Sequence, residues 1–265
     1  MPGCAKATNP SGYTIEFDED SHTYSTFIKE LGKTTYKSAT SVIHRFFPPF
    51  DPDGRITANK ARKMGISVEQ LQFQWKQKSA EACAMGTRVH ETCEDVLTGP
   101  HDLLGNYTFR NQPKSDHERR LMAAGYNASM RVKETMNVIG IEQIVFDFTF
   151  GIAGTIDLLT RDKTDPDLYW ILDWKTNEKI EFHNRWGTHG LDPISHLEDC
   201  SGTHYALQLS IYEWLLRIGK YIPHRAKVRR GIFHLTDDGP KFYELPDMAI
   251  EVRDMMMVIA YEPPF

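Results

Sequence analysis

The segment over residues 151–177, GIAGTIDLLTRDKTDPDLYWILDWKTN, constrains the fold of this chain more than any other. Two apolar runs, at 155–159 and 169–174, flank a polar stretch rich in Asp and Pro. This pattern predicts two strands joined by a turn. Successive side chains of a strand point to opposite faces, so Asp173 and Lys175 should share one face of the second strand.

Charged residues stand where the core of these strands should be apolar. A hairpin would bring Asp157 of the first strand beside Asp173 and Lys175 of the second. Two carboxylates at a sheet rim repel each other unless a cation lies between them, and oxygen ligands suit Mg²⁺ or Mn²⁺ better than zinc. A solvated strand face is the alternative explanation of the Asp-x-Lys motif. The apolar neighbours around Trp174 argue for burial, where unpaired charges are costly.

Several short motifs occur in one order along the chain. They are Gly-x-x-x-His at 86–90, GTID at 154–157, LDWKT at 172–176 and Gln-x-x-x-Tyr at 208–212. Together they resemble the PD-(D/E)XK nucleases and, within them, the RecB-like exonuclease family. The resemblance covers roughly residues 80–220, and the set is far more specific than any one motif.

The resemblance implies an α/β fold. We expect a restriction-endonuclease-like core with a mixed central β-sheet flanked by helices, plus an N-terminal helical lobe. The expected division is a disordered tail at 1–12, an N-terminal hairpin and helical lobe at 13–78, and the nuclease core at 79–265.

The resemblance also implies a metal site. Asp157 and Asp173, with His90 and the main-chain carbonyl of Trp174, would hold one or two Mg²⁺ or Mn²⁺ ions. Lys175 would position the attacking water or stabilise charge in the transition state. Taken alone, a histidine at position 90 is more often a hydrogen-bonded interior residue than a metal ligand.

Further residues are implied at the DNA. Gln208 would support Lys175 or the scissile phosphate, Tyr212 would contact the DNA backbone, and Tyr205 is a weaker addition. Ser41, in a predicted short helix, would lie near the DNA backbone. Without the resemblance, an ordinary helix flank is the favoured explanation of Gln208 and Tyr212, and a helix cap is the favoured explanation of Ser41.

The remaining pattern gives an ordered set of elements. Before the central hairpin we expect a hairpin at 13–27, a short helix at 40–47, a partly helical stretch interrupted at Gly65 at 55–75, helices at 79–97 and 115–140, and a strand at 142–150. The central hairpin itself is expected at 155–174. After it we expect a helix at 203–219, two strands at 228–245 and a closing helix at 246–261. Glu142 is expected on the surface rather than in support of the site.

The polar segment 178–202 is expected to form a loop near the site. Its spacing of His196, Cys200 and His204 suits zinc, but no fourth ligand is obvious. No cysteine follows Cys200, so an iron–sulfur cluster is not expected.

Composition limits the classes of protein that fit. The 265 residues carry a net charge of −5, which argues against unselective coating of nucleic acid. Basic clusters at 55–63 and 225–230 would either hold phosphates or form solvated faces. No apolar run reaches membrane-spanning length, so no membrane partner is expected. The four cysteines are scattered and the N-terminus lacks an apolar signal core. Both features favour a reducing intracellular compartment, such as cytoplasm, nucleoid or a virus-infected cell.

The function implied by the resemblance is metal-dependent hydrolysis of DNA from single-stranded or double-stranded ends. Two alternatives stay open. One is an endonuclease on the same fold, since fold does not determine substrate, and the other is a DNA-binding module without catalysis. The sequence favours no oligomeric state.

Overall fold

The computed structural model describes residues 4–19, 21–29, 32–49, 54–99, 102 and 104–260. The chain divides into two compact units. Unit 1 consists of Met1–Pro48, Arg131–His234 and Lys241–Phe265, and unit 2 consists of Pro49–Met130 and Leu235–Pro240.

The N-terminal strands of unit 1 form an antiparallel sheet in the order β1-β2-β3-β4. Their bounds are β1 (Cys4–Thr8), β2 (Thr14–Asp18), β3 (Thr23–Ile28) and β4 (Gly32–Thr35). Ile15 and Tyr24 of this sheet share a small core with Phe146 and Ala153 of the central sheet. This contact anchors the N-terminal sheet on the central one.

The central sheet of unit 1 has the order β10-β9-β8-β7-β5, and β6 pairs with β7 outside this path. The bounds are β5 (Lys37–Ser38), β6 (Met136–Asp147), β7 (Ile152–Asp162), β8 (Leu168–Lys175), β9 (Lys227–Thr236) and β10 (Gly239–Leu245). Strand β7 is antiparallel to β6 and β8, whereas β5 pairs with β7, and β8 with β9, in parallel. The predicted mixed sheet is confirmed.

Strand β7 contacts different partners along its two edges. Strand β6 pairs with it along nearly its whole length. On the other edge, β5 pairs with Ile152 and Ala153, and β8 pairs with 158–161. Within the described part of the chain, residues 154–157 thus face the opening where β5 and β8 diverge. A strand opening of this kind leaves room for a polar site at the sheet edge.

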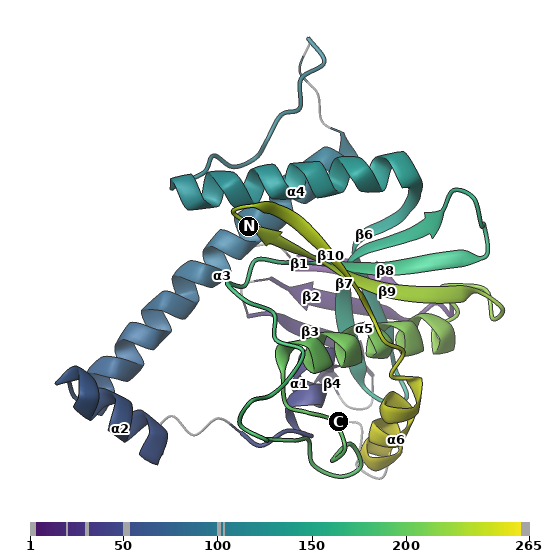
Figure 1. Ribbon diagram of the computed structural model, residues 1–265. Coiled ribbons are helices and arrows are strands. Elements are labelled where there is room, and N and C mark those ends of the chain that lie inside the picture. The colour runs from purple at the N-terminus through teal and green to yellow at the C-terminus, as the bar shows by residue number, and fades with distance from the viewer. Residues whose placement is uncertain are drawn as a thin grey trace. The chain divides into compact units, whose positions relative to one another are not determined.

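Helices cover the central sheet. The helices α1 (Ala39–His44), α5 (Ser201–Ile218) and α6 (Ala249–Ala260) pack on one face, and α5 lies alongside the strands in Figure 1. The shared core includes Val42, Ile43, Ile156, Ile171, Leu207, Ile211, Leu215, Ile232, Val252 and Met255. The opposite face carries Trp170 and Phe233, which lie near Val132 of α4 (Asp116–Thr135). The α/β architecture flanked by helices is therefore as predicted.

Unit 2 is mainly helical and contains α2 (Arg55–Met64), α3 (Val68–Thr98) and most of α4. Gly65, with φ of 66°, ends α2, and Ser67 opens α3 through a capping box with Gln70. The Arg88 guanidinium lies 2.6 Å from the Glu118 carboxylate, an ion pair that joins α3 to α4. Unit 2 also includes residues 235–240, the tip of the β9–β10 hairpin.

The structure differs from the expected elements in three places. Cys4–Thr8 forms β1 by pairing with β2, where a disordered tail was expected. Helix α3 begins at Val68 rather than at 79, because no Gly or Pro interrupts 68–78. Helix α4 ends at Thr135 rather than near 140, because the β-branched stretch after it pairs with β7 as the start of β6.

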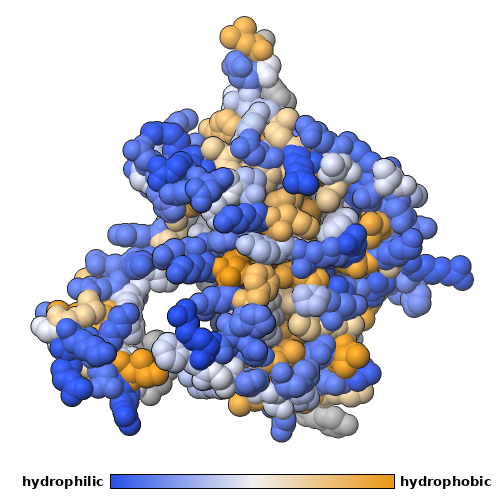
Figure 2. Space-filling model, viewed as in Figure 1, coloured by the Kyte–Doolittle hydropathy of each residue, from blue (hydrophilic) through white to orange (hydrophobic). Residues whose placement is uncertain are grey.

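The face shown in Figure 2 is mostly hydrophilic, with small separate hydrophobic areas. Among the described residues, no helix is both long enough and apolar enough to cross a membrane.

Candidate active site

Three carboxylates lie in one row across β6, β7 and β8. Leu158 pairs with Leu172 at the end of the β7–β8 ladder, so one residue further Asp157 stands opposite Asp173. On the other edge of β7, Glu142 stands opposite Asp157, because the residues on each side of the two pair in the same register. Side chains at directly opposite positions share a face of the sheet.

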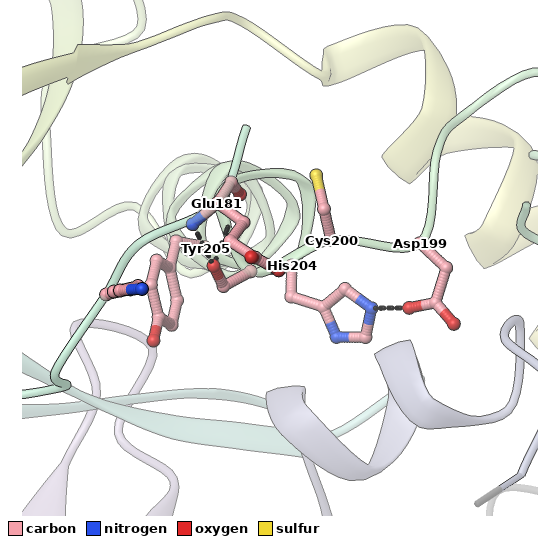
Figure 3. A pocket seen from close by; sticks show the side chains of 7 residues that line it. Glu181, Asp199, Cys200, His204 and Tyr205 are labelled. Atoms are coloured by element: carbon pink, nitrogen blue, oxygen red, sulfur yellow. Dashed lines mark hydrogen bonds and ion pairs between the residues drawn. The ribbon is translucent and has the colours of Figure 1, made fainter. Parts of the chain in front are cut away.

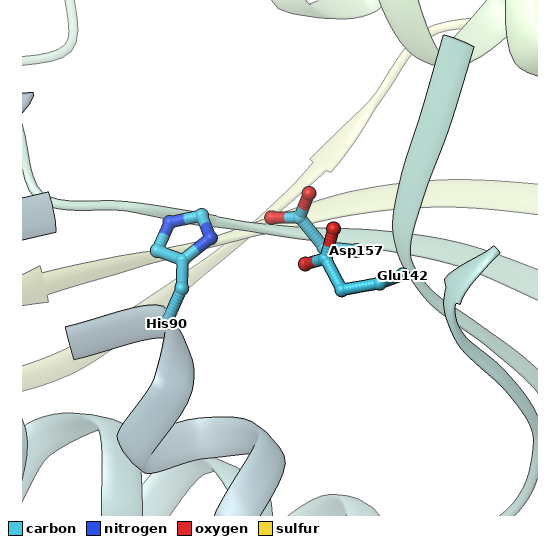
Figure 4. Close-up of side chains that lie close together, drawn as sticks. All are labelled: His90, Glu142 and Asp157. Atoms are coloured by element: carbon cyan, nitrogen blue, oxygen red, sulfur yellow. The ribbon is translucent and has the colours of Figure 1, made fainter. Parts of the chain in front are cut away.

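Glu142 and Asp157 are close in space as well as in register. Each offers a carboxylate oxygen within 4.8 Å of the other, and Figure 4 shows the two carboxylates side by side. Glu142 is exposed and has a φ of 47°, a left-handed conformation that costs a residue with a side chain about 1–3 kcal/mol. Such a conformation persists where the surroundings enforce it, which is common at functional sites.

The inner end of the row contains a buried ion pair. The Lys175 Nζ lies 2.7 Å from Asp173 Oδ2, and Asp173 is only 3% exposed. Asp173 Oδ1 is buried and accepts no hydrogen bond from the described residues. The Trp174 main-chain N–H donates to Asp157 Oδ2 at 3.1 Å. The predicted convergence of Asp157, Asp173 and Lys175 is therefore present.

The electrostatics of the row favour an added positive charge. Burial raises the pKa of Asp157 well above its ordinary value, and the charges of Asp173 and Glu142 raise it further. Burial opposes the charged form of Lys175, but the attraction of Asp173 and Asp157 is stronger in sum, so the net pKa of the lysine is raised. One lysine does not compensate three carboxylates.

The donor set fits a divalent metal. The orphaned Asp173 Oδ1 is a buried acceptor, and a buried acceptor without a donor is costly. Carboxylate oxygens are the ligands that Mg²⁺ and Mn²⁺ prefer. The row could therefore hold such an ion through Asp157 and Asp173, with Glu142 on the exposed side.

A family model for the PD-(D/E)XK nuclease superfamily matches residues 67–255, which include the whole row. The chain belongs to this superfamily. Membership implies a metal-dependent nuclease that acts on DNA, and PD-(D/E)XK nucleases use divalent metals such as Mg²⁺ or Mn²⁺. It also agrees with the restriction-endonuclease-like mixed sheet described above.

Two other comparisons accompany this match. Among solved structures, the chain is similar to SSO0001, with 15% sequence identity, coverage of 86% of this chain and 78% of that chain, and a TM-score of 0.31. No curated protein sequence matches the chain.

Helix α5 supplies the predicted residues beside the PD-(D/E)XK row. The Lys175 Nζ lies 4.7 Å from the centre of the Tyr205 ring, a cation–π contact, and the Tyr205 hydroxyl donates to Asn177 Oδ1 at 2.9 Å. One turn further, the Gln208 amide donates to the Tyr212 hydroxyl at 3.1 Å.

Tyr212 reaches the row through a gap left by glycine. A Cβ built on Gly154 would lie 2.4 Å from Tyr212 Cε1, so any larger residue there would displace the ring. Burial raises the pKa of Tyr212, and the charges of Asp173 and Asp157 add to the effect. The Tyr212 side chain therefore keeps a neutral hydroxyl close to the carboxylates.

The remaining predicted residues come from α3, α1 and β8. His90 is half-buried on α3, in unit 2. Ser41 is exposed on α1, where its backbone N–H donates to the Ser38 side chain, so the N-cap is Ser38 rather than Ser41. The Trp174 side chain stacks on Phe233, on the face away from the row, which leaves only its main chain for the site.

Arg229 and Arg230, in the predicted basic cluster at 225–230, both form ion pairs. Arg229 pairs with Glu244, and the buried Arg230 pairs with Glu213 and with Asp247. Arg229 thus links β9 to β10, and Arg230 links β9 to α5 and to the segment before α6. Because Arg230 is buried and paired, neither the phosphate-binding nor the solvated-face alternative describes it.

The zinc alternative for segment 178–202 has no support in the described residues. His204 Nε2 lies 2.8 Å from Asp199, and His196 lies 3.2 Å from Glu251. The Cys200 thiol lies 3.2 Å from the Thr203 hydroxyl. The three candidate ligands thus have different partners.

Glu142 is exposed, as expected, but the sequence did not show that it stands opposite Asp157. Its position opposite Asp157 depends on the register of β6 against β7, which includes an irregularity between Val138 and Gly140. A strand pattern does not reveal such a bulge. The one available signal was an acidic residue at the start of an apolar strand that leads into the aspartate strand.

Proposed function

We propose that this chain is a RecB-like exonuclease that hydrolyses phosphodiester bonds from DNA ends with Mg²⁺ or Mn²⁺. The observation that carries the nuclease assignment is the row of three carboxylates beside Lys175, with an orphaned buried oxygen on Asp173. The order of the motifs at 86–90, 154–157, 172–176 and 208–212 supports the exonuclease family.

Asp157 and Asp173 would hold the metal, joined by the Trp174 carbonyl and by His90 through the Gly-x-x-x-His motif. Glu142 is an added candidate, because it stands opposite Asp157 in register. The bound metal would lower the pKa of a water and offset charge on the scissile phosphate. Exposure on one side of the row leaves room for a phosphate to approach.

Lys175 would act as a cation rather than as a base. Its raised pKa keeps the ammonium protonated at neutral pH, so it can donate hydrogen bonds but not accept a proton. The contact with Asp173 fixes its direction. A positioned ammonium donates to the attacking water or to the phosphate oxygens as negative charge builds on them.

Residues on α5 would position these groups. The face of Tyr205 confines Lys175, and Gln208 holds the Tyr212 hydroxyl beside the carboxylates. Tyr205 and Tyr212 would also contact DNA, and Ser41 would contact the DNA backbone from α1. Residues 79–265 are proposed as the nuclease core, with 13–78 as an N-terminal lobe that assists binding.

The test is cleavage of end-labelled single-stranded, double-stranded and covalently closed circular DNA in Mg²⁺ and in Mn²⁺. Wild type should degrade linear DNA and spare circles. Lys175→Ala should lower the rate by about 10²–10³-fold, as expected for loss of one charge-stabilising donor. Lys241→Ala, an exposed lysine on β10, is the matched control and should keep wild-type activity.

Each other outcome changes the assignment. Cut circles would establish an endonuclease. Binding of DNA without cleavage in either metal would leave a binding module. Near-normal turnover of a folded Lys175→Ala protein, checked by circular dichroism, would exclude the mechanism. His90→Ala should weaken Mn²⁺ binding without unfolding the chain; unchanged affinity would remove His90 from the ligand set.

A further inference from the structure

A hollow of about 530 Å³ opens between the segment after β8 and the start of α5. Its lining residues are Lys179, Glu181, Asp199, Cys200, Ser201, His204 and Tyr205. Its volume lies in the range of small-molecule sites, and one nucleotide would fit it. Figure 3 shows Tyr205 and His204 directed to the same side of α5, whereas the Cys200 thiol points away from them.

The hollow shares a wall with the candidate active site. The Tyr205 ring that lines it also receives the Lys175 ammonium at 4.7 Å. The other ring, His204, is fixed by Phe47, whose ring centre lies 4.2 Å away, and by Asp199. An occupant of the hollow would therefore touch a ring that contacts the catalytic lysine. On the proposed function, this is the position of a nucleotide beside the scissile phosphate.

Charge decides which part of a nucleotide fits. Two carboxylates, Glu181 and Asp199, line the hollow, against the single ammonium of Lys179. A phosphate group placed there would be repelled by the carboxylates. The neutral base of a nucleotide carries no such penalty.

The carboxylates also have acceptor capacity to spare. Glu181 Oε1 accepts from Arg185 at 3.0 Å, and Asp199 Oδ1 is bonded to His204 at 2.8 Å. The second oxygen of each carboxylate accepts no hydrogen bond from the described residues. Ionised carboxylates accept but never donate, so the complementary ligand presents N–H groups.

We propose that this hollow receives the base of one unpaired nucleotide next to the scissile phosphate, and that Glu181 and Asp199 select bases with an exocyclic amino group over thymine. Cytosine and adenine each present an amino group, and guanine presents adjacent N–H groups that match both oxygens of a carboxylate. Thymine presents one ring N–H between two carbonyl oxygens. A carboxylate repels these oxygens. This inference rests on the proposed function only in taking the occupant to belong to the DNA strand that is cleaved.

The first test is the cleavage rate, kcat/KM, on end-labelled oligo(dC), oligo(dA) and oligo(dT). Wild type should prefer oligo(dC) and oligo(dA) to oligo(dT) by about fivefold, the value of one net hydrogen bond at a half-exposed site. Glu181→Gln and Asp199→Asn should bring this ratio close to one, chiefly through KM. Glu178→Gln, in the same segment but outside the lining, is the matched control and should keep the wild-type ratio.

The second test needs no cleavage. Deoxyguanosine, deoxycytidine and thymidine are titrated into the full chain while the ring signals of Tyr205 and His204 are followed by NMR. The two amino-bearing nucleosides should shift these signals at lower concentration than thymidine does, and Glu181→Gln should remove the difference.

The outcomes separate the two proposals. Failure to cleave any DNA would overturn the proposed function, and the titration would then decide the hollow by itself. Cleavage with equal rates on all three oligonucleotides, or a base preference that folded Glu181→Gln and Asp199→Asn proteins retain, would overturn the base-binding role. Equal responses to the three nucleosides would do the same.

Discussion

Two groups of carboxylates in unit 1 have the same chemistry and opposite surroundings. In the row across β6–β8, Asp173 Oδ1 is buried without a hydrogen bond from the described residues, and the pKa of Asp157 is raised by burial and by its acidic neighbours. In segment 178–202, Glu181 contacts Arg185, and Asp199 contacts His204. Each of these two carboxylates thus has a donor within its own segment or at the start of α5.

The difference teaches how to interpret an acidic cluster. Carboxylates that already have local donors stabilise a loop, and their remaining oxygens suit weak, selective contacts. Carboxylates forced together in a sheet without enough donors are unfavourable alone, and the energy is recovered when a cation binds. The two groups differ in how many donors and positive charges contact the carboxylates, rather than in the number of acidic residues.

The two groups of carboxylates should differ most in how much Mn²⁺ stabilises the protein through them. At an Mn²⁺ concentration about 100 times the dissociation constant, wild type should gain about 2.7 kcal/mol of stability. Asp157→Asn should lose most of this gain, because one ligand charge is absent. Thermal unfolding with and without Mn²⁺ measures it, and Asp199→Asn is the control that should keep the gain. Equal gains in all three proteins would contradict the metal assignment.

Close packing in the row should make Gly154 intolerant of a side chain. Gly154→Ala places a Cβ against the Tyr212 ring, so we expect a loss of about 1–3 kcal/mol in unfolding free energy. Urea denaturation gives the value. The double variant Gly154→Ala with Tyr212→Leu should recover part of the loss, and additive effects would show that the two residues do not interact.

The metal-free protein should reveal the repulsion through pH. The folded-state pKa of Asp157 is raised, so its contribution to stability is present below the unfolded-state pKa of about 4 and is lost as pH rises through the folded value. Asp157→Asn has no such loss. In EDTA, the melting temperature of the variant should therefore rise relative to wild type with increasing pH. A constant difference between pH 4 and pH 8 would contradict the raised pKa.

Segment 178–202 should tolerate change where the row does not. Gly187 has a φ of 66°, and nothing lies within 4 Å of a Cβ built there. Asn adopts this conformation more readily than other residues, so Gly187→Asn should change unfolding free energy by less than about 0.5 kcal/mol. The same urea experiment checks it. A loss as large as that of Gly154→Ala would remove the contrast between the two regions.

The sequence predicted the parts of the fold that follow local rules. The hairpin at 151–177 was visible because apolar runs flank a turn, and its period-two pattern correctly put Asp173 and Lys175 on one face. The end of α2 at Gly65 was visible from the glycine. The roles of Gln208, Tyr212 and His90 came from resemblance and stay predictions.

Other features depend on partners distant in the chain, and local patterns do not reveal them. Cys4–Thr8 has a composition that favours no strand and is ordered by pairing with β2. Glu142 reaches the row only through the register of two long strands. Arg230 looked like part of a basic surface, but Glu213 and Asp247 arrive from other elements and neutralise it in the interior.

The shared register of β6, β7 and β8 has an evolutionary consequence. A codon gained or lost inside the paired part of β7 would rotate one end of the strand by half a turn and carry Asp157 to the opposite face. Codons gained in the turn at 163–167 or in segment 178–202 leave the row intact. Differences in length among relatives should therefore occur mainly in those two places. The lengths of β7 and β8 should be nearly invariant.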